Sequence, residues 1–339
     1  MKAIMIEKPW EVGSIDRERP RAKPGEALIK VCAAGICGSD IGAYRGTNGL
    51  VSYPRIIGHE IAGEIITAPD DSGYESGDRV VADPYLYCGK CYPCSIGRTN
   101  CCTSLNVLGV HIDGGMAEYI AHPAHMLHRI PDAIPWELAP LSEPLTIALH
   151  GLHRMKLASG EHVAIFGAGP IGLLAAMAAI HYGAAPIVID IESKRLEEAL
   201  GLGVKQVINS ETEDLPGKIS EFTDGKMCEC VMEASGASSA IRSTLDIVSH
   251  AGRIALTGWP KEEISLPTEV ITRKEIDIRG ARNSAGEFKE ALDLIATGSV
   301  DVKAVLTQTA GPDDAPAMIR DIDKNPGSYL KVNILFNES

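Results

Sequence analysis

The 339-residue sequence has no surplus of basic residues, and this absence excludes whole classes of partner. It carries 32 Lys and Arg against 45 Asp and Glu, a formal net charge of −13, and its pI is near 5.3. Nucleic-acid phosphates and anionic lipid surfaces repel so acidic a protein. We therefore expect neither nucleic acid nor a membrane as its partner, and an anionic substrate would require a local basic pocket.

The sequence also lacks a segment typical of secretion or of a membrane span. The N-terminus, MKAIMIEKPW, has no long apolar core followed by a small-residue cleavage site. The longest apolar tract, residues 163–190, is interrupted by His181 and Pro186. There is no internal repeat. We expect a cytoplasmic globular protein of two domains, at about 150 residues per domain.

One strand–turn–helix–strand unit organises the sequence. An apolar run at 163–166 leads into Gly167-Ala-Gly169-Pro-Ile-Gly172, then into an Ala/Leu-rich segment and a second apolar run. The first glycine makes the tight turn, the second admits a pyrophosphate close to the backbone, and the third lets helix and strand pack closely. This pattern predicts a dinucleotide site with the diphosphate at the helix N-terminus. The predicted cofactor-binding residues are Gly167, Gly169, Pro170, Ile171, Gly172, Asp190 and Arg195.

Asp190, at the end of the second strand, predicts NAD as the cofactor. A carboxylate there accepts hydrogen bonds from both adenosine ribose hydroxyls and repels the 2′-phosphate of NADP. Lys194 and Arg195 lie close enough in sequence to weaken this preference slightly. For these two basic residues we favour the alternative that they lie on the solvent-exposed face of the next helix and do not contact the cofactor.

Five of the nine cysteines fall between Cys88 and Cys102. Cys88, Cys91 and Cys94 form two overlapping Cys-x-x-Cys steps, a spacing that presents several thiolates to one tetrahedral zinc. In a reducing compartment such clustering indicates a metal rather than disulfides, and unrelated free thiols would be an oxidation hazard. We predict a structural zinc held by these three cysteines and Cys102, with Cys101 as the alternative to Cys102.

Apolar periodicity predicts the fold class. Short strands separated by Pro and Gly fill the N-terminal region, whereas from residue 160 to about 280 apolar strands alternate with helical segments. That alternation predicts an α/β fold with a parallel sheet covered by helices. His122, His125 and His128 lie in a strand-like stretch, and we expect them to be ordinary histidines with satisfied hydrogen bonds.

Gly58-His59-Glu60, the cysteine lobe and the glycine-rich turn occur together in the order typical of the zinc-dependent medium-chain dehydrogenase/reductase family, which the whole chain resembles. The resemblance implies a GroES-like β-rich catalytic domain built from both chain ends and a Rossmann doubly wound domain between them. The catalytic domain would span 1–150 and 282–339, with the zinc lobe at 88–102, and the NAD-binding domain 151–281. A homo-oligomer, dimer or tetramer, is expected by the same analogy.

The resemblance also implies a second, catalytic zinc. Its ligands match Cys37, His59 and Glu143, where alcohol dehydrogenases have a cysteine in place of Glu143. Glu60 matches a glutamate that some members use as a ligand or as an exchange partner. Thiolate, imidazole and carboxylate suit zinc and leave a fourth position open. NAD and two zinc ions per chain are therefore the expected cofactors.

The implied reaction is oxidation of an alcohol, in which zinc lowers the pKa of the substrate hydroxyl and the nicotinamide accepts a hydride. Ser39 matches the hydroxyl that starts the proton relay to solvent. Many relatives have a histidine three residues later, where this sequence has Gly42. Water or the ribose hydroxyls would then complete the relay.

Several segments are most similar to the sugar-acid branch of the family, the L-galactonate, L-gulonate and L-idonate 5-dehydrogenases and their starvation-sensing relatives. These segments are SYPRIIGHE, SIGRTNCC, LGVHIDGGMAEY and GARNSAGEF. They contain the predicted substrate-binding residues Arg55, His111, Arg282 and Asn283. Guanidinium groups bind carboxylates in a bidentate manner.

For Arg55 and Arg282 the alternative is a salt bridge to Glu60 or Glu143 that orients the zinc ligands. The expected activity is oxidation of the C5 alcohol of a hexonate, with L-gulonate to D-fructuronate ahead of L-galactonate to D-tagaturonate. The alternatives are a neutral polyol such as sorbitol, or a non-catalytic nucleotide-binding regulatory protein. Retention of the three catalytic zinc ligands favours an enzyme.

Overall fold

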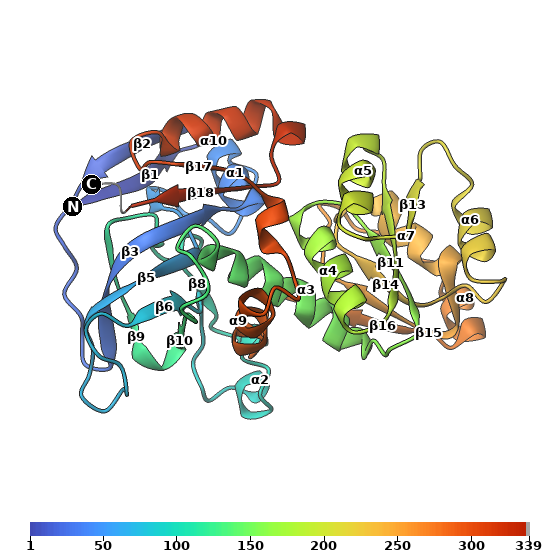
Figure 1. The fold of residues 1–339 in the computed structure, drawn as a ribbon, viewed down its shortest axis with the longest axis horizontal. Helices are drawn as coiled ribbons and strands as arrows, with labels where there is room; N and C mark the ends of the chain where they lie inside the picture. The colour runs from blue at the N-terminus through green and yellow to red at the C-terminus, as the bar shows by residue number, and fades with distance from the viewer. Residues whose placement is uncertain (337–339) are drawn as a thin grey trace. The chain divides into compact units, whose positions relative to one another are not determined.

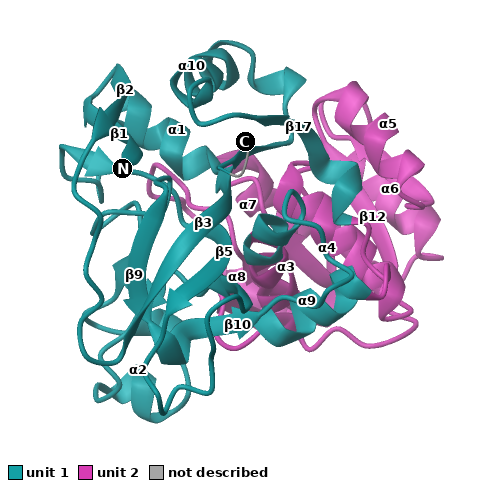
Figure 2. Ribbon diagram, turned by 60° about the vertical axis from the view of Figure 1, so that its left-hand side comes forward, with its two compact units in different colours: residues 1–143, 288–296, 302–339 teal, residues 144–287, 297–301 magenta. Residues whose placement is uncertain are grey.

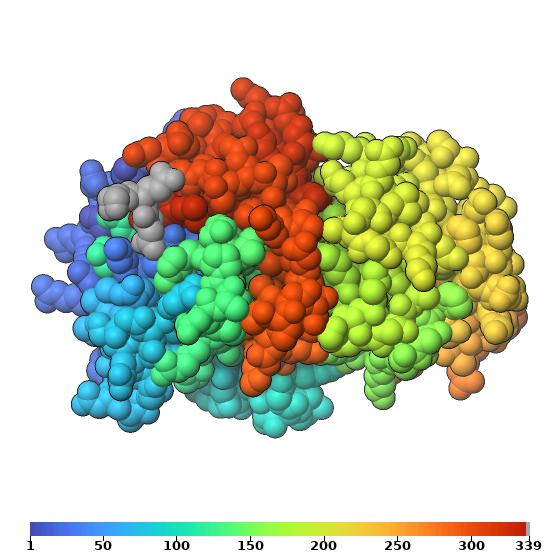
Figure 3. Space-filling model, in the orientation of Figure 1, coloured from blue at the N-terminus to red at the C-terminus, as the bar shows by residue number. Residues whose placement is uncertain are grey.

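The computed structural model describes residues 1–336, which fold into two compact units (Figures 1 and 2). Unit 1 comprises Met1–Glu143, Phe288–Ala296 and Val302–Ser339, and unit 2 comprises Pro144–Glu287 and Thr297–Asp301. The blue N-terminal and red C-terminal surfaces in Figure 3 therefore both belong to unit 1. The predicted domain boundaries at 150/151 and 281/282 remain a prediction, and residues 337–339 of the predicted 282–339 segment lie outside the described residues.

Unit 1 is a β-rich body, as the resemblance implies. Its larger sheet runs β10 (Leu127–Arg129), β6 (Arg79–Ala82), β5 (Glu60–Thr67), β3 (Glu26–Ile36), β18 (Lys331–Leu335) and β17 (Leu306–Ala310), with β9 (Tyr119–Pro123) also paired to β3. A second sheet contains β2 (Glu11–Asp16), β1 (Lys2–Lys8) and β4 (Arg55–Ile56). The helices used below are α1 (Gly38–Arg45), α2 (Tyr92–Ser95), α3 (Ser142–Met155), which continues into unit 2, α9 (Phe288–Ala296) and α10 (Ala315–Lys324).

The long strand β3 positions the zinc-ligand candidates. From Ala27 to Val31 it alternates buried side chains with more exposed ones, as expected for a strand with one covered face, and from Cys32 on every residue is buried. Antiparallel β5 pairs Glu60 with Gly35, and antiparallel β18 pairs Val332 with Ile36. The end of β3, the start of β5 and the start of β18 therefore meet at one edge of the sheet.

Unit 2 is the predicted parallel sheet covered by helices. Its six strands are all parallel, in the order β13 (Gln206–Asn209), β12 (Ala185–Asp190), β11 (His162–Phe166), β14 (Cys228–Glu233), β15 (Val248–Leu256) and β16 (Asp277–Gly280). The helices are α4 (Pro170–His181), α5 (Ser193–Gly201), α6 (Leu215–Phe222), α7 (Ser238–Ile247) and α8 (Thr268–Lys274). The strand order reverses between β11 and β14, and ligands of such sheets bind outside the carboxyl ends of the strands near that point.

The sequence pattern does not predict α6, α8 or α10. Each is short and begins beside a proline: Pro216, Pro267 and Pro316 respectively. Proline is a turn signal in a sequence, yet the first turn of a helix accepts it because the missing N–H has no intrahelical partner there. Within residues 1–336, no helix combines the length and the apolar character needed to cross a membrane.

Candidate active site

Three of the candidate zinc ligands converge in unit 1. Cys37, His59 and Glu60 each offer one ligand atom, and these atoms lie within 4.8 Å of one another. Cys37 directly follows β3 and precedes α1, whereas His59 and Glu60 lie at the start of the neighbouring strand β5. His59, directly before β5, and Glu60, its first residue, are both buried. Strand pairing therefore assembles the group from two separate segments.

Glu143 lies outside this group of three but belongs to the same electrostatic environment. It is 2% exposed, in the first turn of α3, and its Oε1 accepts a hydrogen bond from the Tyr85 hydroxyl. Burial, with a contribution from the neighbouring Glu60 carboxylate, raises the pKa of Glu143 to about 7. The structure thus groups Glu60 with Cys37 and His59, and Glu143 as the third ligand remains a prediction.

The donor set fits a zinc ion. Glu60 Oε1 accepts a hydrogen bond from Lys331 Nζ, which also donates to the Ile36 carbonyl at 3.0 Å. Glu60 Oε2 is buried and accepts no hydrogen bond from any described residue. An unsatisfied buried carboxylate oxygen is costly, and a divalent cation would satisfy it. Thiol, imidazole and carboxylate together are the ligands that zinc prefers.

Several residues that the sequence did not reveal support this group. Asp40 Oδ2 accepts from the Cys37 backbone N–H at 2.9 Å, and Asp40 Oδ1 lies 3.9 Å from His59 Nδ1. A Cβ on Gly35 would lie 1.9 Å from Glu60 Oε2, so only glycine leaves room for that carboxylate. Asp40 is the third residue after Cys37, and an acidic residue at that position of a helix is a capping signal that the sequence carries.

The predicted relay hydroxyl lies beside the candidate ligands. Ser39 Oγ is 3.5 Å from His59 Nε2. Gly42 leaves a space bordered by Thr47 and Asn48. A relay from Ser39 to solvent therefore remains a prediction.

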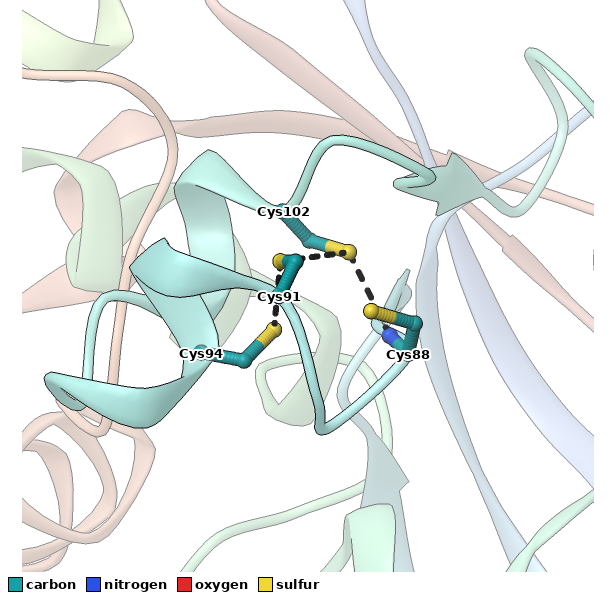
Figure 4. A group of neighbouring side chains, drawn as sticks. All are labelled: Cys88, Cys91, Cys94 and Cys102. Atoms are coloured by element: carbon teal, nitrogen blue, oxygen red, sulfur yellow. Dashed lines mark hydrogen bonds between the residues drawn. The ribbon is translucent and has the colours of Figure 1, made fainter.

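The four predicted cysteines form a second group, whose sulfurs also lie within 4.8 Å of one another. Figure 4 shows Cys88, Cys91, Cys94 and Cys102 pointing toward a common centre. Backbone N–H groups of Cys94 and Thr103 lower the pKa of Cys91 to about 6, which favours the thiolate that binds metal. Cys101 is exposed and outside the group, so the geometry favours Cys102 over it.

Cys91→Ser is expected to remove the lobe zinc and to lower the thermal stability of the protein, because a structural zinc contributes folding free energy. Metal analysis should show a loss of about one zinc per chain, the lobe's single ion. Cys101→Ser, the same change at the exposed cysteine, is the control and should leave metal content unchanged. Equal zinc content in the wild type and Cys91→Ser would show that the predicted ligand set is wrong.

The glycine-rich turn of unit 2 has the geometry of a dinucleotide site. Gly167 has φ +98°, which side-chain-bearing residues rarely adopt, and a Cβ on Gly172 would lie 1.8 Å from the Gly167 carbonyl oxygen. Gly169 precedes α4, whose first turn holds the half-buried Pro170 and Ile171. Backbone N–H groups at this helix start are positioned to receive a diphosphate.

Asp190 and Arg195 both lie at this turn. Asp190 Oδ2 accepts from the Ala168 N–H at 2.6 Å, and Oδ1 accepts from the N–H groups of Ile191 and Glu192 at 2.7 and 2.9 Å. Three donors fix the plane of the carboxylate. Arg195 Nη1 lies 3.4 Å from the position that a Cβ on Gly169 would occupy. The guanidinium therefore reaches the turn, which differs from the solvated face favoured from sequence.

The predicted substrate residues are divided between the units. In unit 1, Arg55 donates to Asp113 at 3.3 Å and to Ser52 at 2.6 Å, so its salt bridge is with Asp113 and not with Glu60 or Glu143. His111 Nδ1 accepts from the Val107 N–H at 3.0 Å.

In unit 2, Arg282 follows β16, and its guanidinium lies 5.8 Å from the centre of the exposed Trp259 ring. Asn283 has φ +49°, a conformation uncommon outside glycine. Among the three histidines of the strand-like stretch, His122 forms a hydrogen bond with the Asp83 carbonyl at 2.9 Å, whereas His125 and His128 contact the rings of Tyr87 and Phe288.

Comparisons with known proteins agree with this architecture. Residues 23–132 match the alcohol dehydrogenase GroES-like domain, and residues 170–297 match the zinc-binding dehydrogenase domain. An uncharacterized zinc-type alcohol dehydrogenase-like protein of Haemophilus influenzae is 54% identical, with 99% of each chain covered. L-galactonate-5-dehydrogenase of Escherichia coli is 35% identical (91% of each), and sorbitol dehydrogenase of Bacillus subtilis is 36% identical (91% of this chain, 89% of the relative).

Among solved structures, RspB of Escherichia coli in complex with NADH matches with a TM-score of 0.93 and 36% identity, covering 99% of each chain. This match spans both units. The chain therefore belongs to the zinc-type medium-chain alcohol dehydrogenase family and is an NAD-dependent dehydrogenase with zinc as its metal.

Proposed function

We propose that the protein oxidises the C5 secondary alcohol of a hexonate, with L-gulonate as the first candidate and L-galactonate as the second. The observation that carries the acid specificity is Arg282, placed two residues beyond the carboxyl end of β16. Ligands of doubly wound sheets bind outside the carboxyl ends of the strands near the β11–β14 reversal, and Arg282 lies on this carboxyl side of the sheet, beside the edge strand β16. On a chain with net charge −13, a guanidinium at this place supplies the local positive charge that a carboxylate substrate requires.

The residues divide the chemistry between the two units. Cys37, His59 and Glu143, with Glu60 as the exchange partner, would hold a zinc ion that supplies Lewis acidity toward the substrate hydroxyl. NAD would supply the hydride acceptor. Ser39 would take up the hydroxyl proton and pass it to water or to the ribose hydroxyls, because Gly42 offers no imidazole.

Asp190 is the proposed determinant of NAD preference. A carboxylate has about four acceptor positions, and three backbone N–H groups donate to that of Asp190. The carboxylate can therefore still accept a hydrogen bond from a ribose hydroxyl. Its negative charge would repel a 2′-phosphate. Arg195 is proposed to contact the cofactor diphosphate from the other side of the turn. We also propose that the protein is a cytoplasmic homo-oligomer, a dimer or tetramer, as its family members commonly are.

The test of the proposal is NADH formation on a panel of hexonates and neutral polyols, run in parallel with NADP. We expect turnover of a hexonate with a higher kcat/KM for NAD. Arg282→Gln should raise the KM for the acid about tenfold to a hundredfold, because hydrogen bonds to charged groups contribute roughly 1.5–3 kcal/mol. The KM for NAD should not change.

Arg242→Gln is the matched control, since Arg242 is exposed and bonds only to the Ser265 carbonyl among the contacts that the structure defines. Activity confined to neutral polyols would contradict the proposal and favour the sorbitol-type alternative. Absence of turnover on every member of the panel, with about one zinc per chain in place of two, would favour a nucleotide-binding regulatory protein.

A further inference from the structure

A tyrosine outside every predicted set contacts the candidate zinc ligand Glu143. Tyr85 is 4% exposed, and its hydroxyl donates a hydrogen bond to Glu143 Oε1. We propose that Tyr85 is a positioning residue that orients Glu143 for zinc and makes it a ligand through one oxygen only. This inference rests on the proposed function, in which Glu143 is the third ligand of the catalytic zinc.

The hydrogen bond assigns different tasks to the two oxygens of the carboxylate. With Oε1 engaged by Tyr85, Oε2 is the oxygen that is presented to a metal. A carboxylate that ligates through a single oxygen occupies one coordination position, and a catalytic zinc must keep a position open for the substrate. Hydrogen bonds of this kind fix the orientation of metal ligands and tune metal affinity.

The two buried carboxylates, Glu143 and Glu60, have hydrogen-bond donors of different charge, Tyr85 and Lys331 respectively. Lys331 is a buried ammonium that pairs with Glu60 and cancels its charge. The Tyr85 hydroxyl is neutral, so its hydrogen bond orients the Glu143 carboxylate without forming an ion pair with it.

The cysteine lobe holds the tyrosine in place. Tyr85 begins the short strand β7 (Tyr85–Leu86), which pairs with β8 (Asn106–Val107). Its ring belongs to a buried apolar cluster with Cys102, Leu105, Val107 and Val110. This packing fixes the ring, so the hydroxyl meets Glu143 at a defined position.

Tyr85→Phe removes only the hydroxyl and keeps the buried ring. Purified protein is equilibrated with graded concentrations of a zinc chelator, and the zinc retained per chain is measured. The two zinc ions should be lost in two separate steps of this titration. The step that is absent in His59→Ala is the one in which the catalytic site loses its zinc. We expect Tyr85→Phe to weaken zinc at that site about tenfold to a hundredfold, while the lobe zinc is released as in the wild type. Cobalt-substituted protein should show a changed visible spectrum for the same site.

Tyr74→Phe is the matched control. The Tyr74 hydroxyl, in the same unit, donates to the Leu127 carbonyl at 2.6 Å and not to a candidate ligand, so its loss should leave zinc affinity unchanged. Unchanged catalytic-site affinity and cobalt spectrum in Tyr85→Phe would overturn the proposal, even if the melting temperature fell. Weakened zinc in a protein that turns over no hexonate would support the role of Tyr85 while refuting the proposed substrate.

Discussion

Replacing His59 with alanine is expected to abolish the dehydrogenase activity while leaving the fold intact. His59 is 6% exposed and shares its ligand cluster with Cys37, so the variant loses the imidazole needed to hold the catalytic zinc. Lewis-acid stabilisation contributes several kcal/mol, and each 1.4 kcal/mol is a factor of ten, so kcat should fall by about a thousandfold or more. Metal analysis should show about one zinc per chain, the one held by the lobe.

His125→Ala is the control for this change. His125 is exposed, lies in the same unit and belongs to neither metal group, so its loss should affect neither zinc content nor rate. Binding of NAD, followed by fluorescence, should be similar in both variants because the glycine-rich turn is in the other unit. Wild-type turnover by His59→Ala would remove the basis for a catalytic zinc at this place.

Lys331→Met is expected to cause the largest loss of stability among single substitutions at the site. Lys331 and Glu60 form an ion pair whose side chains are 4% and 1% exposed. Removing one partner of a buried pair leaves an uncompensated charge and costs about 3–5 kcal/mol. For a unit of this size the melting temperature should fall by roughly 10 °C. Differential scanning calorimetry of the metal-loaded protein provides the measurement.

The double variant Lys331→Met/Glu60→Gln should regain most of that loss, because it removes both charges together. Lys289→Met provides a surface control, since the Lys289–Asp293 pair on α9 is exposed and contributes little. If the double variant were no more stable than Lys331→Met, the loss would stem from packing and not from the buried charge of Glu60.

The sequence predicts best those features that are carried by neighbouring residues. The turn at Gly167–Gly172 and the lobe cysteines are local, so their spacing alone implies a nucleotide turn and a tetrahedral metal site. The parallel sheet of unit 2 follows from the alternation of apolar runs with helical segments, and the structure confirms it. In each case the residues that form the feature are also the residues whose spacing or periodicity can be recognised in the sequence.

Features that depend on long-range pairing were not predictable from the residues alone. Cys37 and Glu143 were paired only through the family resemblance, and Lys331 reaches Glu60 because β18 and β5 both flank β3. Tyr85 had no signal at all, since it occupies an ordinary strand-like stretch. The alternative considered for Arg55, a salt bridge to Glu60 or Glu143, named the wrong carboxylate: two arginines, Arg17 and Arg55, share Asp113 instead.

The most direct test of the account is anomalous diffraction at the zinc edge from crystals of the zinc-loaded protein. Two anomalous peaks per chain are expected, one among the four lobe cysteines and one bonded to Cys37, His59 and a single oxygen of Glu143, with the Tyr85 hydroxyl on the other oxygen. A single peak at the cysteines, with Cys37 and His59 free of metal, would contradict the assignment of a catalytic zinc site to this protein.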